Sequence, residues 1–203
     1  SPLGDGAPVL LVLPGSRRSE IDRLLQDFGQ TVELVRQKVP EVEVVLPAVS
    51  HLEDRIRDSV ARWSVSPEIV TGLEAKKAAF RRGHAALAAS GTVSLELALA
   101  GVPMVVAYRV DWIFRRIKDL NKIFKFAGVE SFVLPNIILG TRAIPEFLDE
   151  EVQPEVLAGH LAKLLSEGPE RAQQLAELSR LDGLMRLPDG HSQRAAAAEV
   201  VLS

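Results

Sequence analysis

Short apolar runs alternate with longer segments of helical periodicity, and this alternation limits the possible folds more than any other feature of the sequence. Residues 9–13 consist only of Val and Leu, and residues 19–38 place apolar side chains three, four and seven positions apart. That spacing is typical of one face of an amphipathic helix. Nearly all-apolar strands that alternate with helices predict a parallel sheet covered by helices on both faces. We expect strands at 9–13, 42–45, 68–71, 85–89 and 103–108, and helices at 19–38, 51–63, 73–82 and 92–100.

The last third of the chain has a different pattern. After Ile144 it is only helical, with helices expected at 154–165, 169–181 and 192–202. A length of 203 residues fits one large domain with a short appendage. We therefore expect a Rossmann-like α/β domain over residues 1–185 and a helical C-terminal segment over residues 186–203. The chain starts at Ser1 and reaches an apolar run within eight residues, which we interpret as a piece of a longer protein.

The composition excludes several classes of function. The chain has no cysteine, so a disulfide framework, a thiolate metal site and a thiol nucleophile are excluded. A formal net charge of −3 argues against a general nucleic-acid binder, which carries a broad basic excess. The longest apolar stretch, at 97–108, contains Gly101 and Pro103 and is too short to cross a bilayer. We expect no metal site, because the four histidines are scattered and no DxD motif is present.

Two strand-to-helix junctions contain the candidate ligand-binding residues, because ligands of parallel sheets bind beyond the carboxyl ends of the strands. At the first junction, Gly15 allows a tight turn, Ser16 offers a hydroxyl group and Arg17 supplies donors for phosphate oxygens. A capped helix start explains the same residues, with Ser16 as the N-cap and Glu20 in the first turn. Both interpretations stay open, because neither a Walker motif nor GxGxxG is present.

The second junction follows the strand at 85–89 and places Ser90, Gly91 and Thr92 at the start of a helix. Free backbone N–H groups and the positive end of the helix dipole suit an anion at such a place. Glu96 is the one charged residue of an otherwise apolar helix. Its carboxylate is either solvated on the outer face or accepts two hydroxyl groups of a ligand such as ribose, and the pattern alone leaves both open.

Three strings in this order resemble the lipid-A-disaccharide synthase family. They are LPGSRRSEI at 13–21, ALAASGTVSLELALAGVPMVVAYRV at 86–110, and LPNIILG at 134–140 followed by PEFL. The resemblance covers residues 9–148 and implies an inverting glycosyltransferase of the GT-B fold. It implies that this chain is the C-terminal, nucleotide-sugar-binding half. The general base and the acceptor site are then expected in the absent N-terminal half.

The resemblance also implies a reaction. The family transfers 2,3-diacylglucosamine from UDP-2,3-diacylglucosamine to 2,3-diacylglucosamine 1-phosphate (lipid X). The products are lipid A disaccharide 1-phosphate and UDP. Because the UDP-sugar is a substrate, we expect no cofactor.

Site residues follow from the same resemblance. Arg17, Ser16 and the helix N-terminus at Gly91 would stabilise the charge that develops on the leaving UDP. Glu96 would hold the ribose hydroxyls. Asn136 lies in a family-like string, as Glu146 does with a weaker signal, and the alternative for Asn136 is a turn residue after proline. The expected nucleotide-binding residues are Gly15, Ser16, Arg17, Ser90, Gly91, Thr92 and Glu96, and the expected catalytic residues are Arg17 and Asn136.

Two further segments bear on partners. Residues 108–132 hold six of the ten aromatic residues and six basic residues, which predicts either contact with an anionic lipid surface or a crossover helix with a basic wet side. The resemblance implies a peripheral enzyme on the cytoplasmic face of the bacterial inner membrane. It also implies that the Ala-rich segment at 189–202 packs on the N-terminal half or is exchanged between the subunits of a homodimer.

Two alternatives stay open from the sequence alone. One is a non-catalytic nucleotide-binding module of the same fold. The other is an enzyme like UDP-N-acetylglucosamine 2-epimerase, although that family uses different local strings. A flavodoxin-like or NAD-binding domain rests on the fold alone, and the absence of GxGxxG counts against it.

Overall fold

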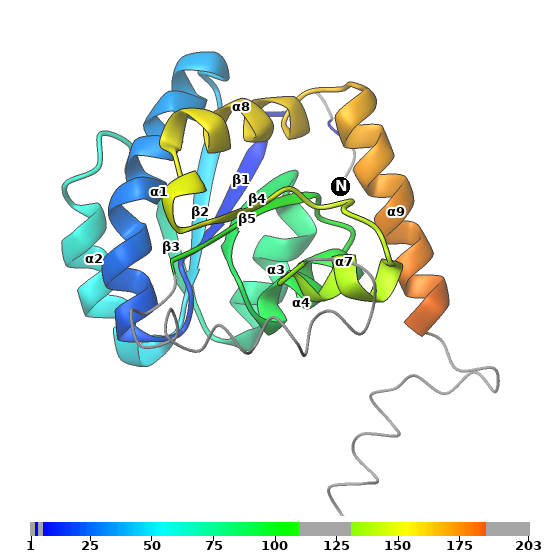
Figure 1. Ribbon diagram of the computed structural model, residues 1–203. Helices are drawn as coiled ribbons and strands as arrows, with labels where there is room; N and C mark the ends of the chain where they lie inside the picture. Colours follow the sequence, from blue (N-terminus) through cyan, green and yellow to red (C-terminus); the bar gives the residue numbers. More distant parts are fainter. Residues whose placement is uncertain (1–2, 4–5, 110–130, 186–203) are drawn as a thin grey trace, which may run out of the picture.

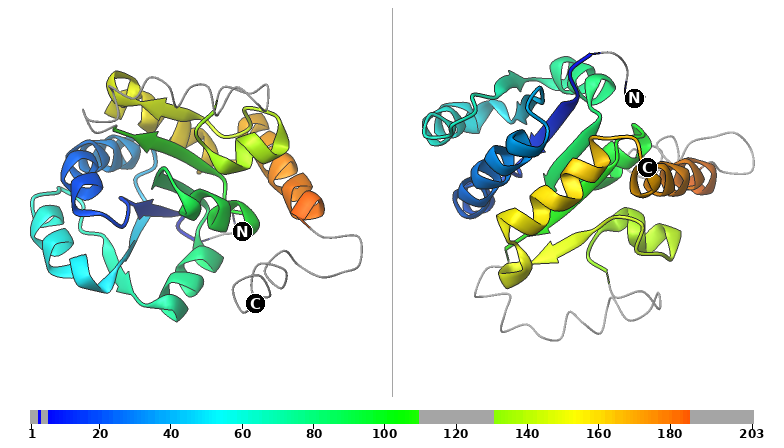
Figure 2. Two further views of the ribbon diagram at one scale, coloured as in Figure 1. Left: turned by 60° about the horizontal axis from the view of Figure 1, so that its bottom comes forward. Right: turned by 90° about the horizontal axis from the view of Figure 1, so that it is seen from above.

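The computed structural model describes residue 3, residues 6–109 and residues 131–185, and it shows a parallel sheet between two layers of helices (Figures 1 and 2). The sheet has six strands in the order β3-β2-β1-β4-β5-β6, and each strand runs parallel to its neighbours. The expected Rossmann-like α/β fold is therefore confirmed. The strands are β1 (Val9–Leu13), β2 (Glu43–Ala48), β3 (Glu68–Thr71), β4 (Ala85–Ala89), β5 (Met104–Tyr108) and β6 (Glu146–Leu148).

Successive side chains of a strand point to opposite faces of the sheet, so each central strand packs against both layers of helices. Leu10 and Val12 of β1 pack with α1, α2 and α8, whereas Leu11 and Leu13 pack with α3, α4, α7 and α9. All four side chains are buried, so the apolar run of β1 is explained by two covered faces. The α-helices are α1 (Arg18–Lys38), α2 (Glu53–Val60), α3 (Leu73–Arg82), α4 (Thr92–Leu99), α7 (Leu134–Leu139), α8 (Pro154–Leu164) and α9 (Pro169–Met185).

The structure differs from the sequence expectation in three elements. Where only helices were expected, β6 adds a strand whose Glu146 pairs with Val106 of β5, because three residues are too few to show a periodicity. The short helix α7 was not expected; it starts beside a proline and ends at Gly140, whose φ is 66°. The expected helix at 51–63 is divided into a 3₁₀ turn (Ser50–Leu52) and α2.

Polar side chains of α9 attach this helix to the sheet. The Gln174 amide accepts a hydrogen bond from the Met104 N–H, and its Nε2 donates to the carbonyls of Met104 and Ala143, each at 3.2 Å. The Arg171 guanidinium is 1% exposed and donates to the carbonyls of His84 (2.7 Å) and Leu164 (2.6 Å). Burial lowers the pKa of this guanidinium. Helix α9 thus packs at the amino-terminal ends of the strands β4 and β5. Ligands of such folds bind at the opposite, carboxyl-terminal ends of the strands.

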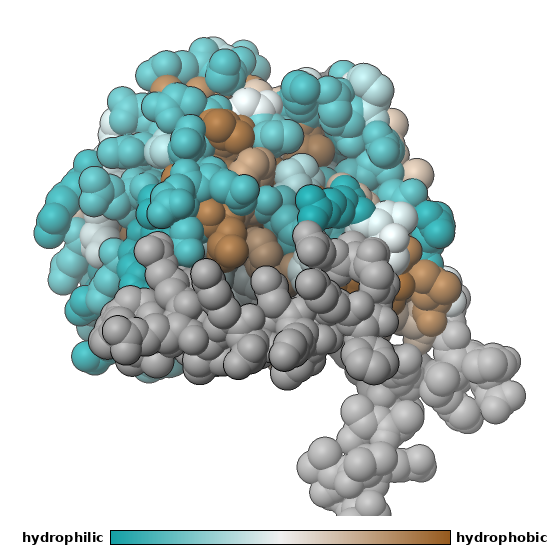
Figure 3. All heavy atoms as spheres, in the orientation of Figure 1, coloured by the Kyte–Doolittle hydropathy of each residue, from teal (hydrophilic) through white to brown (hydrophobic). Residues whose placement is uncertain are grey.

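Two segments with sequence predictions lie outside the described residues. Most of the aromatic and basic segment at 108–132 falls at 110–130, and the Ala-rich C-terminal segment falls at 186–203. The predicted lipid contact, the C-terminal exchange and the domain boundary at residue 185 therefore stay predictions. Before that boundary, the C-terminal end of α9 presents hydrophobic surface, with Leu184 57% exposed (Figure 3). None of the described helices is both long and apolar enough to span a bilayer.

Candidate functional site

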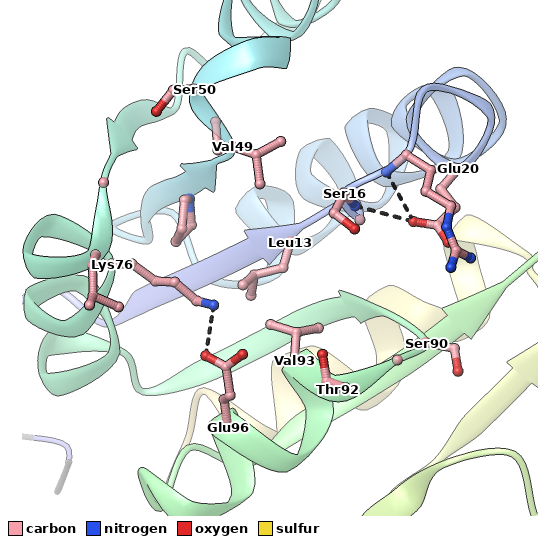
Figure 4. Close-up of a pocket in the computed structure, with 17 residues that line it drawn as sticks. Leu13, Ser16, Glu20, Val49, Ser50, Lys76, Ser90, Thr92, Val93 and Glu96 are labelled. Atoms are coloured by element: carbon pink, nitrogen blue, oxygen red, sulfur yellow. Dashed lines mark hydrogen bonds and ion pairs between the residues drawn. The ribbon is translucent and has the colours of Figure 1, made fainter. Parts of the chain in front are cut away.

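A cavity of about 670 Å³ lies at the carboxyl ends of β1, β2, β3 and β4 (Figure 4). Strand order places β1 next to β4, so the chain leaves these two neighbours toward opposite faces of the sheet. In open α/β sheets such a switch point is where ligands bind. The cavity brings together the two junctions that the sequence singled out. Its lining includes all seven expected nucleotide-binding residues, Gly15, Ser16, Arg17, Ser90, Gly91, Thr92 and Glu96.

The first junction is shaped by Glu20. Its carboxylate accepts hydrogen bonds from the backbone N–H groups of Ser16 (3.2 Å) and Arg17 (3.4 Å), and Arg17 Nη1 lies 3.4 Å from its other oxygen. Gly15 has a φ of 107°, and a Cβ there would collide with the Glu20 carboxylate, so only glycine fits this turn. Arg17, rather than Ser16, is the N-cap residue of α1, which corrects the expectation that Ser16 caps the helix.

The second junction presents an uncapped helix start to the cavity. Gly91, with a φ of 133°, is the N-cap residue of α4, and no side chain caps this terminus. The first turn of α4 contains no acidic residue, and Ser94 Oγ donates to the Gly91 carbonyl at 2.7 Å. Thr92 and Ser90 line the same wall, and the Ser90 hydroxyl lies 3.5 Å from the Phe132 carbonyl. The positive end of the α4 dipole therefore faces a space large enough for an anion.

Glu96 lies on the cavity wall, one turn along α4 from this helix start (Figure 4). Its side chain is 44% exposed, and its Oε2 lies 2.7 Å from Nζ of Lys76 on α3. Glu96 therefore does not lie on an outer face: its carboxylate lines the cavity, where it is accessible to solvent or to a ligand. Lys76 was not among the expected site residues, because a lysine on an exposed helix carries no signal until the fold shows what it approaches.

The charged side chains of the cavity form two pairs. Arg17 is paired with Glu20, and Lys76 is paired with Glu96. The described residues that line the cavity thus carry no net formal charge, and the anion-binding character comes from backbone N–H groups and from cations that can turn toward a ligand. Among residues 6–109 and 131–185, no three acidic or histidine side chains come together to hold a metal ion.

Asn136 is a departure from the expected site. It is fully buried, its Nδ2 donates to the Ile144 carbonyl and its Oδ1 accepts from the Ile144 N–H, each at 2.9 Å. It does not line the cavity, and both polar atoms of its amide are engaged. The structure therefore places Asn136 in the connection between α7 and β6, outside the cavity lining, and its catalytic role stays a prediction.

Glu146, the weaker candidate, is also outside the cavity lining. Its carboxylate accepts hydrogen bonds from the Ser131 hydroxyl (2.8 Å) and from the Phe132 N–H (3.1 Å). The Phe132 carbonyl in turn lies 3.5 Å from the Ser90 hydroxyl. Glu146 thus fixes the segment that lies behind the second junction.

Comparisons with known proteins show the family of the chain. The family model for lipid-A-disaccharide synthetase matches residues 3–200. The chain belongs to the lipid-A-disaccharide synthase family. It is 45% identical over 199 residues to the lipid-A-disaccharide synthase of Nitrobacter winogradskyi, covering 96% of this chain and 48% of the relative. It is 44% identical over 196 residues to that of Bradyrhizobium diazoefficiens, with 97% and 48% covered.

Solved structures agree on the fold. The spinosyn rhamnosyltransferase SpnG superposes with a TM-score of 0.59 at 14% identity, covering 88% of this chain and 41% of SpnG. SpnG complexed with thymidine diphosphate gives a TM-score of 0.57. This likeness shows the GT-B half fold and nothing more specific. The family membership confirms the resemblance noted in the sequence, and the chain spans about half the length of its curated relatives.

The new role of Asn136 makes a prediction. Asn136→Ala removes both hydrogen bonds to Ile144 and leaves a buried carbonyl and a buried N–H group without partners. We expect the free energy of unfolding to fall by about 1–3 kcal/mol, measured by urea denaturation. Backbone NMR shifts of Gly15 and Gly91 should stay unchanged, because Asn136 lies outside the cavity. An unchanged stability, or shifts confined to the two junctions, would contradict this assignment.

Proposed function

We propose that this chain is the donor-binding half of an inverting glycosyltransferase of lipid A biosynthesis. The reaction would transfer 2,3-diacylglucosamine from its UDP donor to 2,3-diacylglucosamine 1-phosphate (lipid X), with release of UDP and the disaccharide 1-phosphate. The observation that carries this proposal is that residues of both glycine-containing junctions line the same cavity in a chain of this family. The whole reaction is a proposal, because the chain spans about half of its relatives.

The diphosphate would lie between the two junctions. Arg17 is 75% exposed and makes only a long contact of 3.4 Å to Glu20, so it is able to turn toward a ligand. The Ser16 hydroxyl and the uncapped start of α4 at Gly91 offer further donors. Breaking the anomeric bond leaves negative charge on the UDP, and donors that are already in place stabilise that charge in the transition state. Thymidine diphosphate in the SpnG complex supports a nucleoside diphosphate in this fold.

Glu96 would bind the ribose. An ionised carboxylate accepts hydrogen bonds at both oxygens, and vicinal hydroxyl groups supply two donors at matching spacing. Glu96 lies one turn along α4 from the anion site at Gly91, which is the order in which phosphate and ribose follow each other in a nucleotide. No cofactor or metal is part of this proposal, since helix dipole and side-chain cations carry the charge stabilisation.

We place the general base and the acceptor site in the other half of the enzyme. The carboxylates in the cavity, Glu20 and Glu96, are each paired with a cation in the donor site. The acyl chains of both substrates support a contact with the cytoplasmic face of the inner membrane, to which residues 108–132 would contribute. Exchange of the C-terminal segment in a homodimer belongs to the same proposal.

Nucleotide binding is the first test. We expect the 203-residue chain to bind UDP, and Arg17→Ala and Glu96→Ala each to weaken binding by about 1.5–3 kcal/mol, because each removes a charged hydrogen-bond partner. Isothermal titration calorimetry measures both effects. Arg18→Ala is the matched control, because Arg18 is exposed on the next position but does not line the cavity. Unchanged affinity in both site variants would place the nucleotide elsewhere.

Turnover is the second test. The 203-residue chain alone should bind UDP but form no disaccharide, because the acceptor site and the base are proposed to lie in the other half. Adding the N-terminal half of the Nitrobacter winogradskyi relative should restore product formation, followed by radiolabelled donor. Turnover by the chain alone would contradict the proposal that the acceptor site and the base lie in the other half. UDP binding with no turnover after addition would favour a non-catalytic nucleotide-binding module.

A further inference from the structure

The cavity contains an ion pair whose lysine has no role so far. The Lys76 side chain of α3 points toward Glu96 of α4, and its Nζ lies 2.7 Å from the Glu96 Oε2 (Figure 4). Both residues line the cavity, and the pair joins the helices that follow β3 and β4 and start at Gly72 and Gly91. The contact is thus a feature of the binding site and not of the outer surface.

Lys76 is held from two sides. Its Nζ also lies 5.4 Å from the centroid of the Phe80 ring, four residues further along α3. Phe80 is 7% exposed and belongs to the core, so the ring is a fixed surface for the lysine. A cation–π contact with the ring and an ion pair with the carboxylate together restrict the lysine side chain, which otherwise has many rotamers. The Lys76 side chain is 30% exposed, which leaves its remaining N–H donors accessible from the cavity.

Glu96 keeps acceptor capacity in this arrangement. Lys76 lies against Oε2, and Oε1 has no protein partner in the described part of the chain. An ionised carboxylate offers about four lone-pair sites, so one lysine contact leaves the others for a ligand. A hydroxyl group that donates to Glu96 can accept a hydrogen bond from Lys76 Nζ at the same time. A ligand carbon without that hydroxyl would remove these hydrogen bonds and leave the two protein groups only each other as partners.

We propose that Lys76 is a positioning residue that makes the site selective for ribose over deoxyribose. It orients the Glu96 carboxylate toward the nucleotide before binding, so that less side-chain entropy is lost when the ligand binds. It also supplies the donor that a ribose hydroxyl oxygen needs. This inference rests on the proposed nucleotide site and adds to it the residue that sets the sugar specificity.

The competing explanation is a surface ion pair without function. Exposed pairs of this kind contribute little to stability, and the chain offers an example on the same helix. Lys77 lies 2.8 Å from Glu74, but neither residue lines the cavity. Lys77→Met is therefore a control that removes the same charge from the adjacent position of α3 without touching the site.

The test compares UDP with 2′-deoxy-UDP by isothermal titration calorimetry on the 203-residue chain. We expect the wild-type chain to prefer UDP by about tenfold or more, because a hydrogen bond to a charged group is lost with the hydroxyl. Lys76→Met and Glu96→Gln should each reduce this preference to within about threefold of unity, for the same reason. Lys76→Arg should restore part of the preference, and Lys77→Met should keep all of it. A merely structural role of Lys76 would lower both affinities together and leave their ratio unchanged.

The outcomes separate the two proposals. If UDP binds, Glu96→Gln loses affinity and Lys76→Met keeps the wild-type ratio, the proposed site stands and the role of Lys76 is overturned. That role is also overturned if Lys77→Met changes the ratio as much as Lys76→Met does. If the wild-type chain binds neither nucleotide, the proposed function fails, and the role of Lys76 fails with it. Urea denaturation of each variant confirms that it is folded.

Discussion

The pairing of β1 with β4 is the constraint on which the rest of the structure depends. Leu13 at the end of β1 is in register with Ala88, so the turns that follow the two strands emerge side by side at one edge of the sheet. Chain connections from these strands go to opposite faces, which opens the crevice between them. The alanine-rich β4 lets helices of both layers approach closely. A cavity between Gly15 and Gly91 is a consequence of this topology.

The two carboxylates of the cavity illustrate how environment separates a structural group from a ligand group. Glu20 is 11% exposed and lies beneath the first turn, where it orders backbone N–H groups and requires glycine at position 15. Glu96 is 44% exposed and has one oxygen without a protein partner in the described residues. The same functional group therefore shapes the anion site at one position and faces the ligand at the other.

Periodicity and local motifs were sufficient for most of the fold and for both junctions, because strands such as β1 and β4 are continuous apolar runs that end in glycine-containing turns. The strand β6 could not be predicted, since its three residues owe their conformation to pairing with β5. The role of Lys76 in the cavity could not be predicted for a related reason, because its partner Glu96 lies twenty positions away on another helix. Asn136 stood in a family-like string, but its bonds to Ile144 show that such strings also preserve packing.

Each role proposed for the cavity residues requires a nucleoside diphosphate in the crevice between the two glycine junctions. A crystal structure of the 203-residue chain with UDP is the decisive experiment. We expect the diphosphate between Arg17 and the start of α4 at Gly91, with the ribose hydroxyls within hydrogen-bond distance of Glu96. Density for UDP at any other place on the molecule, with this crevice still occupied only by solvent, would contradict the proposed site.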